Sequence, residues 1–209
     1  MKTVLNILKY GFVIFLAFLM SGPVLTAVLG SIRTSGEVYT NPFALPRNGI
    51  QWENYTFILG RVDFWRQVGN SLLITIGATI ITVIISSLLA FIFARIDYRG
   101  KEIWFNILML GLLFPLSVAI LPVFIQLMRL NLLDSYWGVI LPIATFSTPG
   151  NTVILRNFFT AIPTELEDAA YIDGCTPLGF FRYILFPMAR PTIAAVATLE
   201  VVASWNEYF

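Results

Sequence analysis

Long runs without charged residues dominate the chain and set its architecture. Four such runs extend from Tyr10 to Ile32, Gln67 to Ala94, Ile103 to Met128 and Ser135 to Leu155, and a fifth, with two acids, begins at Pro191. A helix rises roughly 1.5 Å per residue, so about 20 apolar residues cross a hydrocarbon core of about 30 Å. The runs are continuously apolar instead of alternating, which argues against the strands of a transmembrane barrel. The pattern predicts an all-α polytopic bundle of transmembrane helices with five spans.

Composition narrows the possible functions. The 209 residues are 57% hydrophobic and 12% charged, with a mean hydropathy of +0.80, so the solvent must be largely lipid. A net charge of +1 gives no basis for binding nucleic acid. Histidine is absent and Cys175 is the single cysteine, which excludes Ser-His-Asp and Cys-His catalysis and the usual zinc sites. No phosphate-binding loop of the Gly-x-x-x-x-Gly-Lys-Ser/Thr type occurs, so we expect no enzyme, no metal and no cofactor bound by this chain.

Basic residues indicate the orientation of the chain in the membrane. With a cytoplasmic N-terminus, eight of the 13 lysines and arginines fall in inside segments, Lys2 and Lys9 among them. The short loop 95–102, Arg-Ile-Asp-Tyr-Arg-Gly-Lys-Glu, is the stronger indicator and also points inside. The first run is too long for an ordinary signal peptide, so we expect it to remain as a span.

Prolines and glycines mark the connections and the bends. Loop 33–66 contains Pro42, Pro46 and Gly49, which fits either an ordered external cap with little regular structure or a simple connector. Proline also interrupts the third run at Pro115 and Pro122 and the fourth at Pro142 and Pro149. Because proline removes a backbone donor, we expect bent helix axes there.

The polar segment before the last run has the strongest local order. Thr164 followed by Glu167 is typical of a capping box, in which the two side chains accept from free amides at the start of a helix. Gly174 stands where a left-handed residue would end that helix. Thr176 and Pro177 then predict a second helix start. We expect a helix–turn–helix along the cytoplasmic surface.

Spacing within this segment resembles the EAA loop of ABC importer permeases. Asp168-Ala169-Ala170, three residues, Gly174, nine residues, then Ile184-Leu185-Phe186-Pro187 follows the pattern Glu-Ala-Ala, three residues, Gly, nine residues, Ile-x-Leu-Pro. Asp168 replaces the glutamate and Phe186 replaces the leucine. Three further phrases are similar to the maltose-type (MalG-like) carbohydrate-uptake branch: Asn70-Ser71, Tyr136-Trp137-Gly138 and Trp205-Asn206-Glu207.

The resemblance implies a type I ABC importer permease fold of six spans, with five present and the chain ending before the last transmembrane helix. Residues 1–209 would form one permease domain, and residues 163–187 its cytoplasmic EAA loop. Helix 164–174 would be a coupling helix seated on an ATPase subunit. The residues implied in this coupling are Pro163, Thr164, Glu165, Glu167, Asp168, Ala169, Ala170, Asp173, Gly174, Ile184 and Pro187.

The same resemblance implies which partner subunits this chain has. A transporter of this kind contains a cytoplasmic ABC ATPase dimer that uses the ATP, a second permease subunit and an extracytoplasmic solute-binding protein. It would lie in a bacterial or archaeal plasma membrane and move a sugar or oligosaccharide inward. The alternative is a permease of the same superfamily that carries a non-sugar solute.

Three polar or aromatic residues in the last run are candidates for a solute pathway or a subunit interface. Glu200 lies well inside the run, where an ionised side chain usually faces a cavity or a partner. Trp205 and Asn206 could stack on and hydrogen-bond to a sugar, although tryptophan near a helix end is more often an interfacial anchor.

Two other classes of membrane protein are less well supported. A secondary transporter needs intramembrane ionisable residues or inverted repeats, and only Glu200 and Glu207 qualify. An intramembrane hydrolase would need a histidine or a pair of intramembrane aspartates, which the runs lack.

Overall fold

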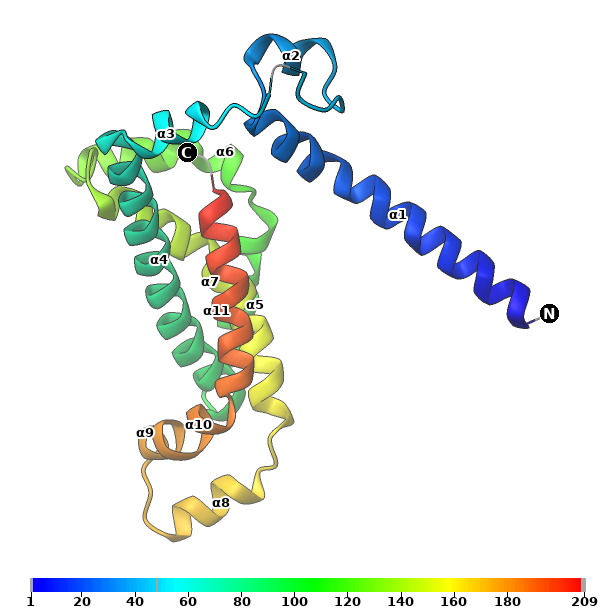
Figure 1. Ribbon diagram of the computed structural model, residues 1–209. Coiled ribbons are helices and arrows are strands. Elements are labelled where there is room, and N and C mark those ends of the chain that lie inside the picture. Colours follow the sequence, from blue (N-terminus) through cyan, green and yellow to red (C-terminus); the bar gives the residue numbers. More distant parts are fainter. Residues whose placement is uncertain (1, 48, 208–209) are drawn as a thin grey trace. The chain divides into compact units, whose positions relative to one another are not determined.

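The computed structural model describes residues 2–47 and 49–207, without the side chains of residues 2–5, 7, 116 and 117. The charge of Lys2, used above for orientation, therefore lies outside the described side chains. Every regular element in the described part is a helix (Figure 1). Three helices are long and apolar enough to cross a membrane, or up to five spans if each of two bent helix pairs counts as one. The all-α class is confirmed.

The chain divides into two compact units, of which the first is Met1–Val68. It begins with the long helix α1, Lys2–Ser31, whose segment Leu8–Ser31 has a mean hydropathy of 2.4. Two short helices follow, α2 at Ser35–Thr40 and α3 at Glu53–Leu59. The apolar side chains along α1 are mostly exposed, as expected of a helix that faces lipid.

Loop 33–66 contains more regular structure than we expected. Its prolines fall between α2 and α3, so both helices form outside the Pro42–Gly49 stretch. The Arg33 side chain is buried and donates to the carbonyl oxygens of Asn41 and Pro42, at 2.8 and 3.2 Å. Asn54 of α3 donates to the Arg33 carbonyl oxygen at 3.0 Å. These bonds order the connection, because they satisfy the carbonyls that follow the end of α2.

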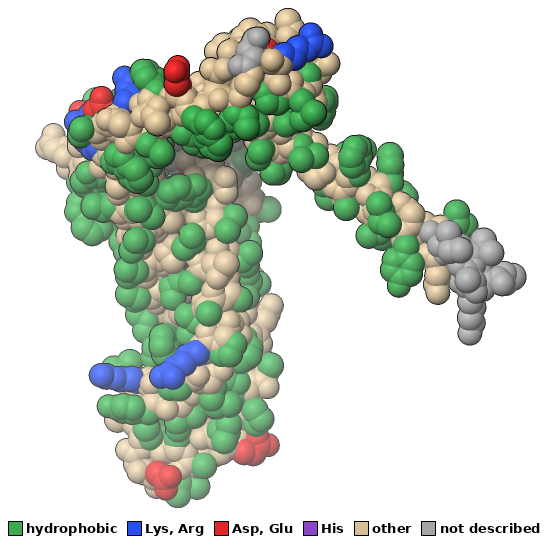
Figure 2. Space-filling view, in the orientation of Figure 1, with side chains coloured by type: hydrophobic (Ala, Val, Ile, Leu, Met, Phe, Trp, Pro, Cys, Tyr) green, Lys and Arg blue, Asp and Glu red, His purple; other side chains and the backbone are tan. Residues whose placement is uncertain are grey.

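The second unit, Gly69–Phe209, is built on three long helices: α4 (Val62–Arg95), α7 (Tyr136–Ala161) and α11 (Arg190–Asn206). On the visible side of α4 and α11, Figure 2 shows many hydrophobic side chains, and charged side chains only toward the ends. Along most of its length the buried side of α4 is instead small or polar, with Thr75, Ala78, Thr79, Thr82, Ser86, Ser87 and Ala90. Near its end, Phe91 and Phe93 are buried as well. Such side chains let membrane helices approach closely and bond to one another.

The third apolar run folds as two helical arms with a sharp bend between them, which together are long and apolar enough for one span. These are α5 (Lys101–Leu110), continued by the 3-10 turn η1 (Gly111–Leu113), and α6 (Leu116–Arg129). The arms meet at 107°. Phe114 is extended because the following Pro115 disfavours the helical conformation there. The break predicted at Pro115 is confirmed, whereas α6 and α7 continue through Pro122, Pro142 and Pro149.

Gly138 near the start of α7 is required by a close backbone approach. A Cβ atom at this position would lie 2.3 Å from the carbonyl oxygen of Leu132. A Cβ at Gly69 in α4 would meet nothing within 4 Å. The two glycines therefore form a matched pair for mutagenesis.

We predict that Gly138→Ala lowers the free energy of unfolding by about 1–3 kcal/mol, because the turn before α7 must move to admit the methyl group. Gly69→Ala should leave it unchanged or raise it by up to about 1 kcal/mol. Thermal unfolding of the detergent-solubilised protein measures both. Equal midpoints for the two variants would contradict this account of the turn.

Candidate functional site

The EAA loop begins where α7 ends. Pro163 disfavours the helical conformation at Ile162, which is extended with φ −73° and ψ 133°. The short helix α8, Glu165–Ile172, follows after Thr164. Figure 1 shows α8 set apart from the long helices, with a non-helical segment on each side. The predicted short helix is confirmed.

The predicted capping box at the start of α8 is wrong. Thr164 has helical angles, φ −70° and ψ −23°, and its side chain makes no capping hydrogen bond. A capping side chain normally needs an extended residue at this position. The Glu167 carboxylate, which should have completed the box, turns to other partners. The amides of Glu167 and Asp168 bond instead to the Thr164 carbonyl oxygen, at 2.9 and 3.0 Å.

The predicted end of α8 is confirmed. Gly174 has φ +80°, a left-handed conformation that glycine adopts without steric cost. The amide of Cys175 donates to the Ala170 carbonyl oxygen at 2.9 Å, and the amide of Gly174 donates to that of Tyr171 at 3.0 Å. This pair of bonds is the Schellman arrangement.

The second half of the EAA loop starts as predicted. The Thr176 hydroxyl accepts from the Gly179 amide at 3.1 Å, and Pro177 opens α9, Pro177–Phe180. The π-helical segment η2 (Phe181–Leu185) and α10 (Phe186–Met188) follow. The chain then bends by 76° into α11. Within this half, Ile184 and Pro187 are half-buried.

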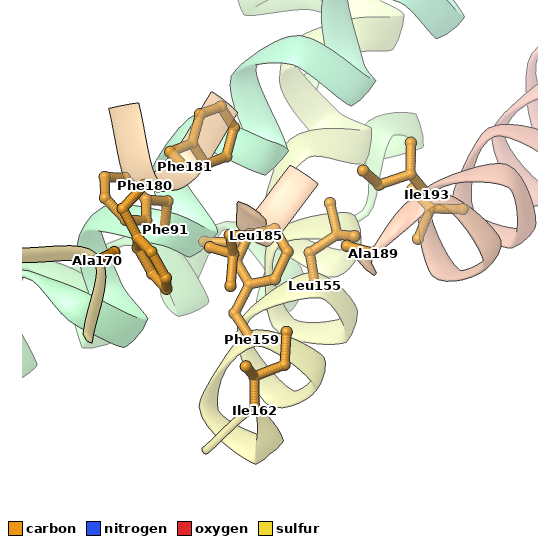
Figure 3. Close-up of a cluster of buried hydrophobic side chains, with 12 residues drawn as sticks. Phe91, Leu155, Phe159, Ile162, Ala170, Phe180, Phe181, Leu185, Ala189 and Ile193 are labelled. Atoms are coloured by element: carbon orange, nitrogen blue, oxygen red, sulfur yellow. The ribbon is translucent and has the colours of Figure 1, made fainter. Parts of the chain in front are cut away.

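A cluster of buried apolar side chains holds this half of the loop against the long helices (Figure 3). The Phe181 ring lies 5.0 Å from that of Phe91 in α4 and 6.4 Å from that of Phe159 in α7, centroid to centroid. Phe159, Phe180 and Leu185 are fully buried. The helices α4, α7 and α11 thus share one core with the EAA loop.

The helix α8 has a buried face and an exposed face. Glu167 and Ala170 are its buried residues, with 9% and 5% of their surface exposed. Most of the predicted coupling residues are exposed: Pro163, Thr164, Glu165, Asp168, Ala169, Asp173 and Gly174. Ile172 is 86% exposed, and the sequence reading did not single it out. The exposed face therefore includes Glu165, Leu166, Asp168, Ala169 and Ile172, whereas Glu167 and Ala170 face the chain's own core.

Arg95, at the end of α4, reaches Glu167. Its Nη1 atom lies 3.3 Å from Glu167 Oε2, and its Nη2 donates to the carbonyl oxygens of Phe159, at 2.6 Å, and of Ile162. The sequence indicated Arg95 only as an inside positive charge. A clue lay in its position at the last turn of a helix, where cations bond to free carbonyls.

Tyr171 completes this group of polar side chains. Its hydroxyl donates to Glu167 Oε1 at 2.8 Å. Partial burial, reinforced by the bond to the Glu167 carboxylate, raises the pKa of Tyr171 to about 12. The phenol therefore stays protonated at neutral pH and serves as a donor to the carboxylate.

Glu200 lies between α4, α7 and α11, and 2% of its surface is exposed. The Asn151 amide of α7 donates to Oε2 at 2.9 Å. Thr82 of α4 and Ser204 of α11 bond to Oε1 at 3.4 and 3.3 Å. In this conformation the carboxylate faces the chain's own helices, so it ties the three together.

Trp205 and Asn206 occupy the far end of α11. Trp205 is half-exposed and, with Ser71 and Ser204, lines a cavity of about 210 Å³. The Asn206 amide donates to the Val202 carbonyl oxygen at 2.7 Å, which engages one of its two N–H groups. Within residues 2–47 and 49–207, no three His, Cys, Asp or Glu side chains gather closely enough to hold a metal ion.

We predict that Asn151→Asp lowers the free energy of unfolding by about 1–3 kcal/mol, because it buries a second acceptor against Glu200. The double variant Asn151→Asp/Glu200→Gln exchanges the two groups, so that the carboxylate is at position 151 and the amide at position 200. The shapes of the side chains are unchanged. The double variant should recover most of the loss in thermal unfolding. A double variant as unstable as Asn151→Asp alone would contradict the stabilising role of the Asn151–Glu200 hydrogen bond.

Comparison with known proteins identifies the family. Residues 87–209, which include the EAA loop, match the family described as "Binding-protein-dependent transport system inner membrane component". The diacetylchitobiose uptake system permease protein NgcG of Streptomyces coelicolor is 31% identical over 186 residues, 89% of this chain and 61% of the relative. The arabinooligosaccharides transport system permease protein AraQ of Halalkalibacterium halodurans is 32% identical over 205 residues, 97% of this chain and 72% of the relative. The chain thus spans between three fifths and three quarters of these relatives.

The fold is also that of a solved transporter. The crystal structure of a bacterial ABC transporter involved in the import of the acidic polysaccharide alginate contains a chain that superposes with a TM-score of 0.84. The two chains are 24% identical, and the match covers 99% of this chain and 72% of the other. On the evidence of residues 87–209 and of AraQ, this chain belongs to the binding-protein-dependent transport system inner membrane components, a family of multi-pass membrane proteins.

Proposed function

We propose that this chain is the permease subunit of an ATP-driven importer that moves a sugar or oligosaccharide into the cytoplasm, with α8 as its coupling helix. The observation that carries the proposal is the exposed face of α8. A short helix with a formed C-terminal cap stands off from the long helices and turns Asp168, Ala169 and Ile172 outward. A soluble partner can take such a helix into a groove.

The chemistry of this face suits a cleft on a cytoplasmic ATPase subunit. Ile172 offers an exposed apolar side chain, and Ala169 is small enough for another backbone to come close. Glu165, Asp168 and Asp173 surround them with negative charge, which basic groups of the partner would complement. The apolar centre would contribute affinity and the acidic rim would fix the orientation.

The partners follow from the same proposal. Two ATPase subunits would bind and hydrolyse the ATP, and a second permease subunit and an extracytoplasmic solute-binding protein would complete the transporter. The names of the relatives, diacetylchitobiose and arabinooligosaccharide permeases, support an oligosaccharide cargo. A cytoplasmic N-terminus would place loop 95–102 and α8 on the same, ATPase-facing side.

The mechanism requires that α8 moves as a lever. Closure of the ATPase dimer around ATP would displace α8, and the long helices would change from an inward-facing to an outward-facing arrangement. Release of the hydrolysis products would reverse the change. In this cycle the permease catalyses no reaction. It converts a displacement of α8 into a change in the side of the membrane from which the solute can enter.

We predict that Ala169→Trp abolishes uptake, because the indole fills the space that the ATPase surface needs. Ala161→Trp, an exposed alanine at the end of α7, is the matched control and should retain uptake. Uptake of a panel of labelled oligosaccharides by cells carrying the complete transporter measures both. Membrane insertion of the two variants should be equal.

Crosslinking tests the partner directly. A photo-crosslinking residue at position 169 should capture an ATPase subunit, and one at position 161 should not. Wild-type uptake by Ala169→Trp, or failure to capture the ATPase, would overturn the coupling role. Failure to carry any oligosaccharide of the panel would overturn the sugar assignment alone.

A further inference from the structure

The helix α8 has few side chains with which to grip the rest of the chain. Its buried residues are Glu167 and Ala170. Ala170 offers one methyl group to the core around Phe180. The Tyr171 ring adds one contact, to the Phe180 ring, with centroids 6.3 Å apart. Because burial of a methyl group contributes about 0.8 kcal/mol, this apolar packing holds the helix weakly. The other buried side chain is the Glu167 carboxylate, so the attachment of α8 to the rest of the chain depends on what that carboxylate contacts.

The Glu167 carboxylate contacts an arginine whose two Nη atoms are both engaged. The side chains of Arg95 and Glu167 are only 4% and 11% exposed. Arg95 also bonds to the carbonyl oxygens of Phe159 and Ile162. One guanidinium therefore joins the end of α4, the end of α7 and the buried face of α8.

This ion pair differs from the others that the structure describes. Lys101–Asp97 and Arg66–Asp63 join residues within four positions of each other, and Arg156–Glu102 has an exposed carboxylate. Exposed pairs are screened by water and contribute little. A buried, hydrogen-bonded pair holds its partners in one geometry, and loss of either partner leaves a buried charge.

The contact between Glu167 and Arg95 takes the place of a capping interaction at the start of α8. Glu167 stands where it could have capped the start of α8, and it does not. Both of its oxygens bond elsewhere, Oε2 to Arg95 and Oε1 to the Tyr171 hydroxyl. The Arg95 Nε atom is buried without a partner among the described residues, so the two Nη atoms make all the contacts of this group.

We propose that Arg95 and Glu167 form a brace that fastens the coupling helix α8 to the ends of α4 and α7, so that displacement of α8 moves these two helices directly. The inference rests on the proposed function of α8. Without the brace, α8 would still be joined to α7 through residues 162–164 and to α11 through α9, η2 and α10, and Ala170 would still pack in the apolar core. It would lose its ion pair to α4. Arg95 and Glu167 are thus positioning residues that determine where the movement goes.

The test replaces the carboxylate by an apolar side chain of similar volume, Glu167→Met. Arg95 keeps its two carbonyl acceptors in this variant. Glu165→Met is the matched control on the same helix, because Glu165 is exposed. Both are made in the assembled transporter with Cys175→Ser and a single new cysteine at Ser71, near the opposite end of α4. Two quantities are measured: the ATP hydrolysis rate, and the change in the maleimide labelling rate at Ser71 between the nucleotide-free and ATP-trapped states.

We expect Glu167→Met to bind the ATPase and hydrolyse ATP, while the nucleotide-dependent change in labelling falls about tenfold, a typical loss for a residue on a coupling route. Glu165→Met should keep both quantities. A merely structural role would lower assembly, hydrolysis and labelling together. If Glu167→Met does not accumulate in the membrane, Glu167→Gln decides, because it keeps the shape and one hydrogen bond but loses the charge.

The outcomes separate the brace from the proposed function. A full labelling change in Glu167→Met, or in Glu167→Gln where that variant decides, would overturn the brace and leave the coupling role of α8 intact. Failure of position 169 to capture the ATPase in the wild-type protein would overturn the coupling role first. If the labelling rate of a cysteine at position 71 is the same in the nucleotide-free and ATP-trapped states of the otherwise wild-type transporter, both the brace and the coupling role are overturned.

Discussion

The guanidinium of Arg95 occupies a junction at which three helices end or turn. The last carbonyls of α7 need donors, the buried face of α8 carries a carboxylate, and α4 delivers one cation to both. In a bundle whose outer surface is apolar, a polar contact of this kind specifies a single arrangement, because any other leaves a charge buried without a partner. The position of α8 relative to the long helices depends on this contact.

The same principle operates deeper in the bundle, with weaker bonds. Glu200 accepts from Asn151 of α7 and lies beside hydroxyls of α4 and α11. Small residues such as Ala78 and Ala90 allow the helices to come close enough for those bonds. Between the two polar sites lies the aromatic cluster around Phe159 and Phe181. Two polar contacts and one apolar core thus connect α4, α7, α8 and α11.

The sequence predicted the features that depend on local chemistry. Continuous apolar runs specified the helices, Pro115 the break in the third run, and Gly174 the left-handed end of α8. Each follows from steric or solvation rules that act within a few residues. The spacing of the EAA loop pointed to the family that the comparisons then identified.

The sequence reading failed where a distant partner decided the outcome. Glu167 looked like a capping residue, because the competing donor, Arg95, is 72 positions away. Ala170 was placed on the contact surface, yet it faces the chain's own core. Ile172 was overlooked, since an exposed isoleucine cannot be recognised until the face of α8 that is buried is known. Tertiary contacts of this kind leave no mark in local spacing.

The central claim is that α8 and α4 move together, and a distance between them tests it most directly. Spin labels at Leu166→Cys in α8 and Ile92→Cys in α4, both on partly exposed sites, would report that distance in the assembled transporter by pulsed electron paramagnetic resonance. The account predicts the same distance distribution in the nucleotide-free and ATP-trapped states. A shift of its maximum by more than its width would contradict a rigid connection between the two helices.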